Sequence, residues 1–176
     1  MALTLYAHPF SSYCQKVLTA LWEKDLPFVY RHLEDEGAAA ERVTLWPLGR
    51  FPVLVDDGRT IVESSIIIEY VDLQHPGPSR LLPEDPAAAL DVRFLDRFFD
   101  HYVMTPMQKP VLEALRAESS RSQETMADAR KALDTAYAWL EDRLSGQSWA
   151  VGDSFTMADC AAAPSLFYAD WVHPIG

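Results

Sequence analysis

The segment Arg50–Ser65 carries the side chains whose types and spacing best suit the binding of a small peptide. Two β-rich runs flank Asp57-Gly58, a dipeptide typical of a tight type I′ hairpin. Pro52 stands at the entrance, and Glu63-Ser64 stands at the exit, directly before an apolar helical run. A strand edge, a carboxylate, a hydroxyl and a helix N-terminus therefore arrive at one place. This combination suits a small peptide with a free carboxylate; an ordinary hairpin followed by a capped helix is the alternative.

A second group of reactive side chains opens the first predicted helix. Ser11 or Ser12 is its natural N-cap, and Cys14 lies one turn inside it on the apolar stripe. A free thiol has a pKa of about 8.5 and is a poor nucleophile at neutral pH. The unpaired N–H groups and positive dipole end of a helix start can stabilise a thiolate, and a serine hydroxyl can donate to its sulfur. The helix start thus offers a site for activating a thiol.

Other residues offer alternative chemistry. Ser11-Ser-Tyr-Cys14 mimics the C-x-x-C motif of thiol oxidoreductases, with serine at the nucleophilic position. Cys14 is therefore an alternative redox residue, although a cysteine on an apolar stripe is typically a small buried hydrophobe. Tyr6, within a predicted strand, is an alternative source of a hydroxyl. Cys160 is interpreted as a core residue.

These groups must be positioned by the elements around them. The first part of the chain predicts a βαβ unit with parallel strands, a short helix, a hairpin and a further helix. The predicted elements are a strand over 3–7, a helix over 12–22, a strand over 26–33, a weak helix over 37–46, strands over 53–56 and 59–62, and a helix over 65–75.

Beyond these elements the pattern is wholly helical. A Pro-rich stretch over 75–86 reads as a linker. A stripe follows that includes Leu90, Phe94, Phe98 and Tyr102, and Thr105-Pro106 and Lys109-Pro110 are expected to interrupt or kink this region.

Two further helices complete the prediction. Apolar residues at helical spacing from Met126 to Leu144 predict an amphipathic helix that stops at Ser145-Gly146. Thr156-Met-Ala-Asp159 predicts a last helix with a start like a capping box, and Pro164 is expected to bend it.

Composition narrows the class of protein. The 176 residues include 26 acidic and 15 basic side chains, a formal net charge of −11. The longest basic run is Arg130-Lys131, so neither nucleic acid nor an anionic membrane is an expected partner. No secretory signal or apolar run of about 18 residues is present. Two distant cysteines form no metal-ligand pattern, which favours a reduced, cytoplasmic protein.

The order of these elements, together with four motifs, resembles the cytosolic glutathione transferase family. Ser11-Ser-Tyr-Cys-Gln-Lys-Val-Leu18 resembles its serine-type active-site turn, Phe51-Pro52-Val53 its cis-proline turn, Glu63-Ser64 its glutathione-binding pair, and Thr156–Asp159 its capping box. The resemblance implies an α/β, thioredoxin-like domain of order βαβα-ββα over 1–77, a linker over 78–86 and an all-helical domain over 87–176. It also implies a homodimer, with helices near 66–71 and 90–97 at the interface.

The resemblance implies a role for each residue of the first domain's site. It aligns Ser11 with the catalytic serine, five residues before the basic position Lys16, with Ser12 as the alternative. Glutathione is implied as co-substrate, without a metal. The residues implied to hold it are Arg50 at the glycine carboxylate, Phe51, Pro52 in cis and Val53 at the cysteine moiety, Glu63 at the amino group and Ser64 at the γ-glutamyl carboxylate.

A hydrophobic second substrate should meet apolar side chains at the domain cleft. The candidates are Phe10, Phe99, Tyr102, Met104, Met107 and Tyr168. Aromatic and methionine side chains at helical spacing are also typical of a core.

The function expected from these residues and the resemblance is addition of the glutathione thiolate to electrophilic hydrophobic compounds. Two alternatives stay open: a glutathione-transferase-like binding or interaction module without catalysis, and a glutathione-dependent thiol-disulfide oxidoreductase that uses Cys14. Family members usually continue with one or more further helices, so the helical domain is expected to be incomplete.

Overall fold

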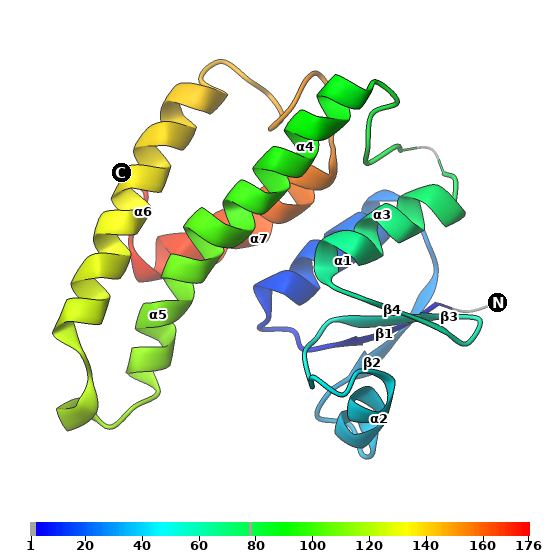
Figure 1. Ribbon diagram of the computed structural model, residues 1–176, viewed down its shortest axis with the longest axis horizontal. Coiled ribbons are helices and arrows are strands. Elements are labelled where there is room, and N and C mark those ends of the chain that lie inside the picture. Colours follow the sequence, from blue (N-terminus) through cyan, green and yellow to red (C-terminus); the bar gives the residue numbers. More distant parts are fainter. Residues whose placement is uncertain (1–2, 78) are drawn as a thin grey trace. The chain divides into compact units, whose positions relative to one another are not determined.

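The computed structural model describes residues 3–77 and 79–176, which form two compact units (Figure 1). The first unit extends to Ala89 and the second begins at Leu90. The division therefore falls inside helix α4 (Pro86–Phe98), a few residues beyond the linker expected over 78–86. Residue 78 of that linker lies outside the described residues.

The first unit is built on a four-stranded mixed sheet. Its strands are β1 (Leu3–Ala7), β2 (Phe28–His32), β3 (Val53–Asp56) and β4 (Arg59–Val62). Their order is β2-β1-β3-β4; β1 and β2 are parallel, whereas β3 is antiparallel to both β1 and β4. With α1 (Ser12–Glu23), α2 (Ala38–Leu45) and α3 (Ser64–Gln74), this is the predicted order of elements, and the predicted fold class is confirmed.

Strand β2 is shorter than the predicted 26–33. The backbone N–H of Leu26 donates to the carbonyl oxygen of Leu21 at 3.0 Å, so Leu26 belongs to the turn that ends α1. At the other end, the N–H of Leu33 donates to the carbonyl oxygen of Ala7 at 3.2 Å, which keeps the chain beside β1 for one more residue.

The predicted hairpin turn is confirmed. Asp57 and Gly58 have φ angles of 47° and 82°, and Asp56 pairs with Arg59 across the two-residue loop. Positive φ at both central residues defines a type I′ turn, whose twist matches that of the flanking strands. This turn sets the register of β3 against β4, and hence the place where α3 begins.

A buried ion pair fastens the chain after α3 to the first unit. Lys24 Nζ lies 2.9 Å from Asp72 Oδ1, and both side chains are almost fully buried. The two oxygens of Asp72 also accept from the backbone N–H groups of Leu81 and Leu82, at 3.0 and 3.1 Å. These bonds satisfy the remaining lone pairs of the buried carboxylate and hold residues 81 and 82 against α3.

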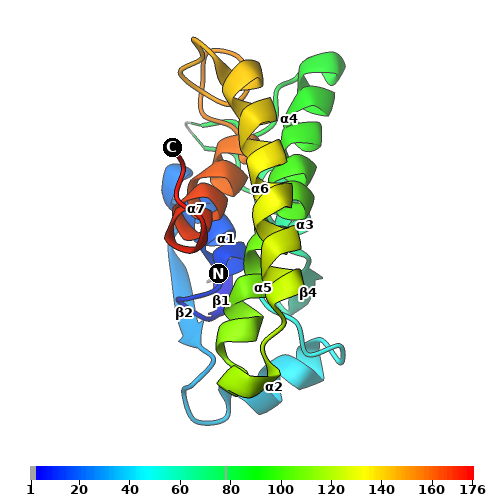
Figure 2. The same cartoon turned by 90° about the vertical axis from the view of Figure 1, so that its left-hand side faces the viewer.

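The second unit is helical. Besides α4 it contains the π-helix η1 (Phe99–Met104), α5 (Thr105–Ala114), the 3₁₀-helix η2 (Glu118–Ser120), α6 (Gln123–Leu144) and α7 (Met157–Val172). Helix α6 packs along α5 and η1, and α7 packs on η1 and α5. Helix α4, η1 and α5 follow one another without a break from Pro86 to Ala114 and form one continuous helical rod. Figure 2 shows α6 lying beside this rod.

The prolines do not break this rod. Pro106 lies in the first turn of α5 and Pro110 lies inside the helix. The interruption expected near Thr105-Pro106 takes the form of the π-helix η1 just before it. Pro106 has no N–H to donate to the preceding turn. Next to it, the Asp100 carbonyl oxygen accepts from both the backbone N–H and the hydroxyl of Thr105, the latter at 3.0 Å.

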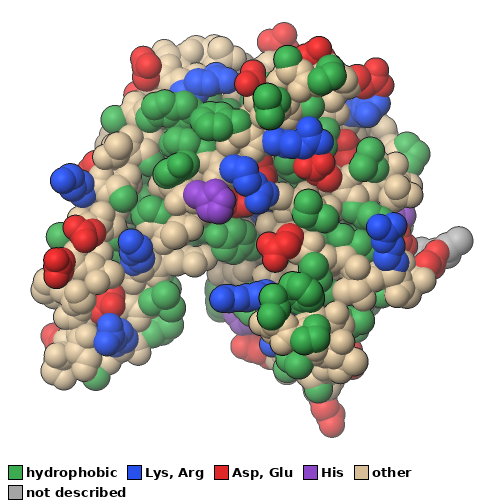
Figure 3. Space-filling view, viewed as in Figure 1, with side chains coloured by type: hydrophobic (Ala, Val, Ile, Leu, Met, Phe, Trp, Pro, Cys, Tyr) green, Lys and Arg blue, Asp and Glu red, His purple; other side chains and the backbone are tan. Residues whose placement is uncertain are grey.

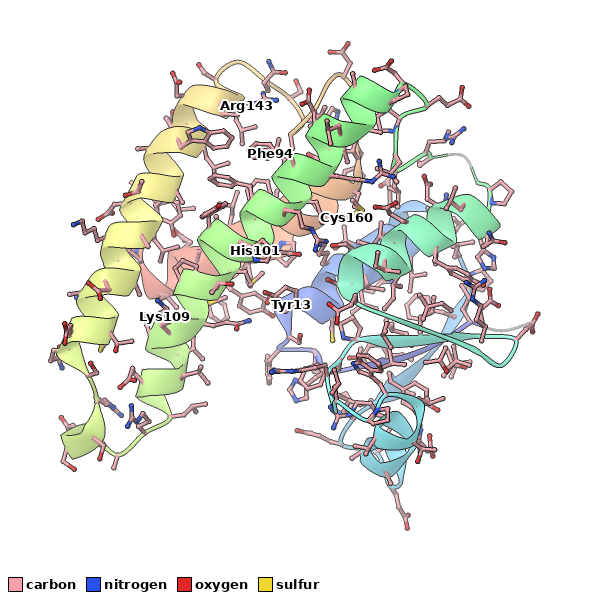
Figure 4. All side chains as sticks on the ribbon, in the orientation of Figure 1. Tyr13, Phe94, His101, Lys109, Arg143 and Cys160 are labelled. Carbon is pink, nitrogen blue, oxygen red and sulfur yellow. The ribbon has the colours of Figure 1, made fainter. Side chains whose placement is uncertain are left out.

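The predicted capping box opens α7. Asp159 Oδ2 accepts from the Thr156 backbone N–H at 2.8 Å and from the Thr156 hydroxyl at 2.9 Å. Asp159 Oδ1 accepts from the backbone N–H of Ala150 at 2.8 Å, which also ties the preceding loop to the helix start. Pro164 lies inside α7, and Cys160 on its buried face is fully covered (Figure 4).

Two surface properties bear on the possible partners. On the face shown in Figure 3, the Lys and Arg side chains are scattered among Asp and Glu and form no continuous basic surface. Within the part of the chain that the structure describes, no helix is long and apolar enough to cross a membrane.

Candidate functional site

The register of three strands brings the predicted glutathione-side residues to one edge of the sheet. Tyr6 of β1 pairs with Val53 of β3, and Val53 pairs with Val62 of β4. Neighbouring strands lie about 5 Å apart, so these three residues span only about 10 Å. The chain that leaves β1, the chain that enters β3 and the chain that leaves β4 therefore meet at this edge. Ser11, Pro52 and Glu63-Ser64 lie on those three segments.

Ser11 is the N-cap of α1. It has extended backbone angles, φ −88° and ψ 117°, and its Oγ accepts from the Cys14 backbone N–H at 3.3 Å. A hydroxyl carries one proton as well as its lone pairs, so capping through the oxygen does not use the proton; the same hydroxyl also interacts with the Cys14 thiol. Ser12, the alternative, is the first residue inside the helix and is buried.

The alternative hydroxyl of Tyr6 is already engaged. It donates to Glu41 Oε2 at 3.0 Å, and the same carboxylate is paired with Arg31. Burial raises the pKa of Tyr6, and the hydrogen bond to Glu41 raises it further.

The Cys14 thiol lies in an unfavourable place for a thiolate. Its side chain is fully buried, and this burial raises the pKa of the thiol above its ordinary value. The Ser11 hydroxyl and the His8 backbone N–H, which lies 3.4 Å from Sγ, lower the pKa by less. Sequence could place Cys14 on the apolar stripe but could not measure this burial.

The turn before β3 has the expected form. The Phe51–Pro52 peptide bond is cis, and Pro52 and Val53 are buried while Arg50 and Phe51 are exposed. Arg42 of α2, which the sequence did not single out, lies against this turn. Its guanidinium is 5.4 Å from the centre of the Phe51 ring and donates to the Gly49 carbonyl oxygen.

The start of α3 is set up for an anion. Glu63, the N-cap, makes no side-chain capping bond and is exposed; the first turn of α3 contains no acidic residue. The Nζ of Lys16 donates to the Ser65 hydroxyl at 2.8 Å, and both side chains are buried. A helix N-terminus with a buried ammonium group beside it favours negative charge at Ser64. Lys16 is thus a second residue whose place in the site only the fold reveals.

Glu63 also has an unusual backbone. Its φ of 69° and ψ of 118° lie outside the regions that residues with a Cβ favour. Such conformations persist where the surrounding structure imposes them, and they concentrate at ligand sites.

The six residues expected to meet a second substrate have different surroundings. Phe10, in the first unit, is 80% exposed. In the second unit Tyr102 is exposed and Tyr168 is half-buried, whereas Phe99, Met104 and Met107 are buried. The burial of Phe99, Met104 and Met107 agrees with the alternative interpretation that they are core residues.

A cavity of about 520 Å³ in the second unit does not involve these residues. It is lined by Tyr137, Ala138, Leu140, Glu141, Leu144, Ser145, Gly146, Leu166, Ile175 and Gly176. Among residues 3–77 and 79–176, no group of three or more His, Cys, Asp and Glu side chains is placed to hold a metal ion.

Family descriptions match both units. "Glutathione S-transferase, N-terminal domain" matches residues 5–79, and "Glutathione S-transferase, C-terminal domain" matches residues 123–174.

Three curated relatives illustrate the similarity. The glutathione S-transferase-like protein LUC7 of Fusarium is 34% identical over 80% of this chain and 64% of its own length. Maleylacetoacetate isomerase of Rattus norvegicus is 33% identical over 94% of this chain and 77% of its own. FtsZ-localized protein A of Caulobacter vibrioides is 30% identical over 96% and 77%, respectively. The chain thus spans less than two thirds of the first relative and about three quarters of the other two.

Solved structures of glutathione S-transferases are similar to this chain over most of its length. A glutathione S-transferase from Methylobacterium radiotolerans, in complex with glutathione sulfonate, has a TM-score of 0.82 and 29% identity, covering 99% of this chain and 86% of that one. A glutathione S-transferase from Methylobacillus flagellatus with glutathione bound has a TM-score of 0.84 and 27% identity, covering 97% and 84%. With both family descriptions matched in order and a relative of 33% identity covered over 77% of its length, this chain belongs to the glutathione S-transferase family.

Proposed function

We propose that this chain is a glutathione transferase, in which Ser11 stabilises the glutathione thiolate for attack on a hydrophobic electrophile. The observation that carries the proposal is the meeting of the α1 start, the cis-proline turn and the α3 start at one sheet edge. Family members with 27–29% identity whose structures contain glutathione or glutathione sulfonate support the same ligand.

Ser11 is the residue proposed to meet the sulfur. Its Oγ accepts from the helix, and its proton is available to a thiolate beside the positive end of α1. Donation from a hydroxyl to an anionic sulfur favours the charged form and so lowers the pKa of the thiol. Ser12 remains the alternative donor.

The remaining contacts hold the peptide. We assign the γ-glutamyl carboxylate to Ser64 and the N-terminus of α3, where Lys16 adds positive charge. Exposed Glu63 would take the ligand's amino group, Val53 and its neighbours Phe51 and Pro52 its cysteine moiety, and Arg50 its glycine carboxylate. Arg42, beside the same turn, adds a second cation near that carboxylate.

The electrophile is proposed to be apolar. Phe10, Tyr102 and Tyr168 are the candidates whose side chains retain exposed surface. The homodimer and the cytoplasmic location expected from the sequence remain predictions.

Retention on immobilised glutathione, combined with conjugation of a generic aromatic electrophile, tests the proposal. We expect Ser11→Ala to lower kcat/KM about a hundredfold, the usual effect of removing one stabilising donor, while glutathione affinity changes little. Ser120→Ala, on exposed η2, is the control for a lost hydroxyl elsewhere. Full conjugation activity in Ser11→Ala would contradict the assignment, and loss in Ser12→Ala alone would transfer the role to Ser12.

A binding or interaction module is the second candidate. The chain is 30% identical to FtsZ-localized protein A, nearly the same as its 33% identity to maleylacetoacetate isomerase. This similarity supports the second candidate. Retention on glutathione without conjugation of any electrophile tested would support this candidate over the first.

A further inference from the structure

His8 organises the turn that carries Ser11. This residue follows β1 directly, and three of its atoms bond within the turn. Its carbonyl oxygen accepts from the Ser11 N–H at 3.0 Å, and its backbone N–H donates to Cys14 Sγ at 3.4 Å. Its ring Nδ1 accepts from the Phe10 N–H at 3.2 Å. The N–H groups of the two residues that end the turn therefore both bond to His8.

The ring bond sets the tautomer of His8. A nitrogen that accepts a hydrogen bond must carry a free lone pair, so the proton of the neutral ring is on Nε2. Nε2 lies 3.4 Å from Glu34 Oε1, which can accept that proton's hydrogen bond. The side chain thus joins the Ser11 turn to the chain that follows β2.

His32 makes the same local bond at the end of the neighbouring strand. Its Nδ1 accepts from the N–H two residues on, that of Glu34, at 3.1 Å. His32 pairs in register with Ala7, and the His8 and His32 ring centres are 5.5 Å apart. Two histidine turns therefore stand side by side at the ends of two parallel strands, but only the first leads into Ser11.

The His8 ring also reaches the other side of the proposed site. Its centre lies 6.4 Å from that of Phe51, the residue before Pro52, and 5.7 Å from that of Phe10. One side chain thus contacts the turn before α1 and the turn before β3.

We infer that His8 is a positioning residue for Ser11: its Nδ1 holds the Phe10–Ser11 backbone so that the Ser11 hydroxyl is presented at the thiol position. The inference rests on the proposed function of the site. His8 acts through Ser11 and is not assigned any contact with glutathione. Without the Nδ1 acceptor the Phe10 N–H loses its partner, and the turn that orients the hydroxyl loosens.

Two substitutions at His8 separate the acceptor from the ring. His8→Phe keeps an aromatic ring for the contacts with Phe10, Phe51 and His32 but has no acceptor. His8→Asn restores an acceptor at the δ position, because Asn bonds the N–H two residues on in an Asx turn. His32→Phe is the matched control, since it removes the same bond from the sibling turn.

The experiment measures conjugation kinetics, glutathione affinity and the pKa of bound glutathione, the last from thiolate absorbance across pH. In His8→Phe we expect kcat/KM to fall about fivefold to tenfold and the thiol pKa to rise, with glutathione affinity changed less than about threefold. His8→Asn should regain most of both losses, and His32→Phe should change neither measurably.

The other outcomes separate this inference from the proposed function. Unchanged kinetics and thiol pKa in His8→Phe, or an equal loss in His8→Asn, would overturn the positioning role while the site's function stands. An equal loss in His32→Phe would also overturn it, because the effect would be general loosening of the strand ends. A wild-type protein that shows no bound thiolate would overturn the proposed function and this inference with it.

Discussion

At the scale of single residues, the reactive groups near the start of α1 differ in their surroundings. The cap that Ser11 provides uses the oxygen of its hydroxyl and not the proton, whereas the proton of the Tyr6 hydroxyl is donated to Glu41. Cys14 is fully buried on α1, with the His8 N–H and the Ser11 hydroxyl as neighbours of its sulfur. These differences favour serine as the donor to a thiolate and oppose a thiol-disulfide mechanism.

The reactivity of Cys14 gives a direct test. Because burial raises the pKa of this thiol, the thiolate is scarce at neutral pH and is covered by the core. We expect iodoacetamide to modify Cys14 in the native protein at pH 7 far more slowly than in urea, as mass spectrometry would show. Cys14→Ala should retain conjugation. Rapid native labelling, or loss of disulfide reduction in Cys14→Ala, would favour the oxidoreductase alternative.

At the scale of elements, the start of α3 combines an unusual backbone conformation at Glu63 with the proposed binding of the γ-glutamyl group. Glu63 has a positive φ and makes no capping bond, so no local hydrogen bond of its side chain offsets the energetic cost of this backbone conformation. The β3–β4 hairpin and the burial of Ser64 and Ser65 impose it. A residue held in this way is expected to lower the free energy of unfolding while it keeps a contact with the ligand.

Replacing Glu63 by Gly tests both the cost in stability and the contact with the ligand. Glycine adopts positive φ without a Cβ penalty, so we expect Glu63→Gly to raise the free energy of unfolding by about 0.5–1 kcal/mol, measured by urea denaturation. Loss of the carboxylate should weaken glutathione binding about tenfold. Glu63→Ala is the matched variant, since it loses the carboxylate but keeps the strain. Without strain, the greater freedom of glycine in the unfolded chain would leave Glu63→Gly about 0.4–1 kcal/mol less stable than Glu63→Ala, and that result would contradict the prediction.

At the scale of the whole molecule, several carboxylates depend on their partners to stay ionised. The Ser122 N–H, followed by Arg116, lowers the pKa of Glu113, which fastens the α5–α6 connection. Burial acts to raise the pKa of Asp56, but hydrogen bonds from His75 and Tyr70 outweigh it and lower the value. A lowered pKa contributes stability above the unfolded value and loses it as pH falls through the folded value.

Acid unfolding is therefore expected to track these groups. The wild-type unfolding midpoint should be highest near neutral pH and fall as pH drops below about 4, the usual range of unfolded carboxyls. Glu113→Gln should be less stable than wild type at pH 7, and the difference should shrink as the wild-type carboxyl becomes protonated. Thermal melts from pH 3 to pH 7 measure this. A difference independent of pH would show that the charge of Glu113 contributes nothing.

Much of the fold was predictable because it depends on short-range chemistry. Asp57-Gly58 specifies its turn through φ angles that few residues adopt, and the Thr156–Asp159 box closes within one helical turn. Ser11 caps α1 through a bond to a residue three positions away. Pro106 and Pro110 predicted an interruption or kink less reliably. The helix continues past both prolines, because a π-helix precedes them and α5 packs on α6 and α7.

The order of the elements, the turns and the helix caps could be predicted from the residues alone, as could a family resemblance that points to Ser11 and Glu63-Ser64. The surroundings of each candidate side chain became known only from the fold. Glu41 engages Tyr6 across 35 positions, Lys16 meets Ser65 across 49, and His8 reaches Glu34 across 26. Caps and turns are closed by neighbours in the chain, whereas burial, pKa and hydrogen-bond partners depend on which distant segments the sheet brings together.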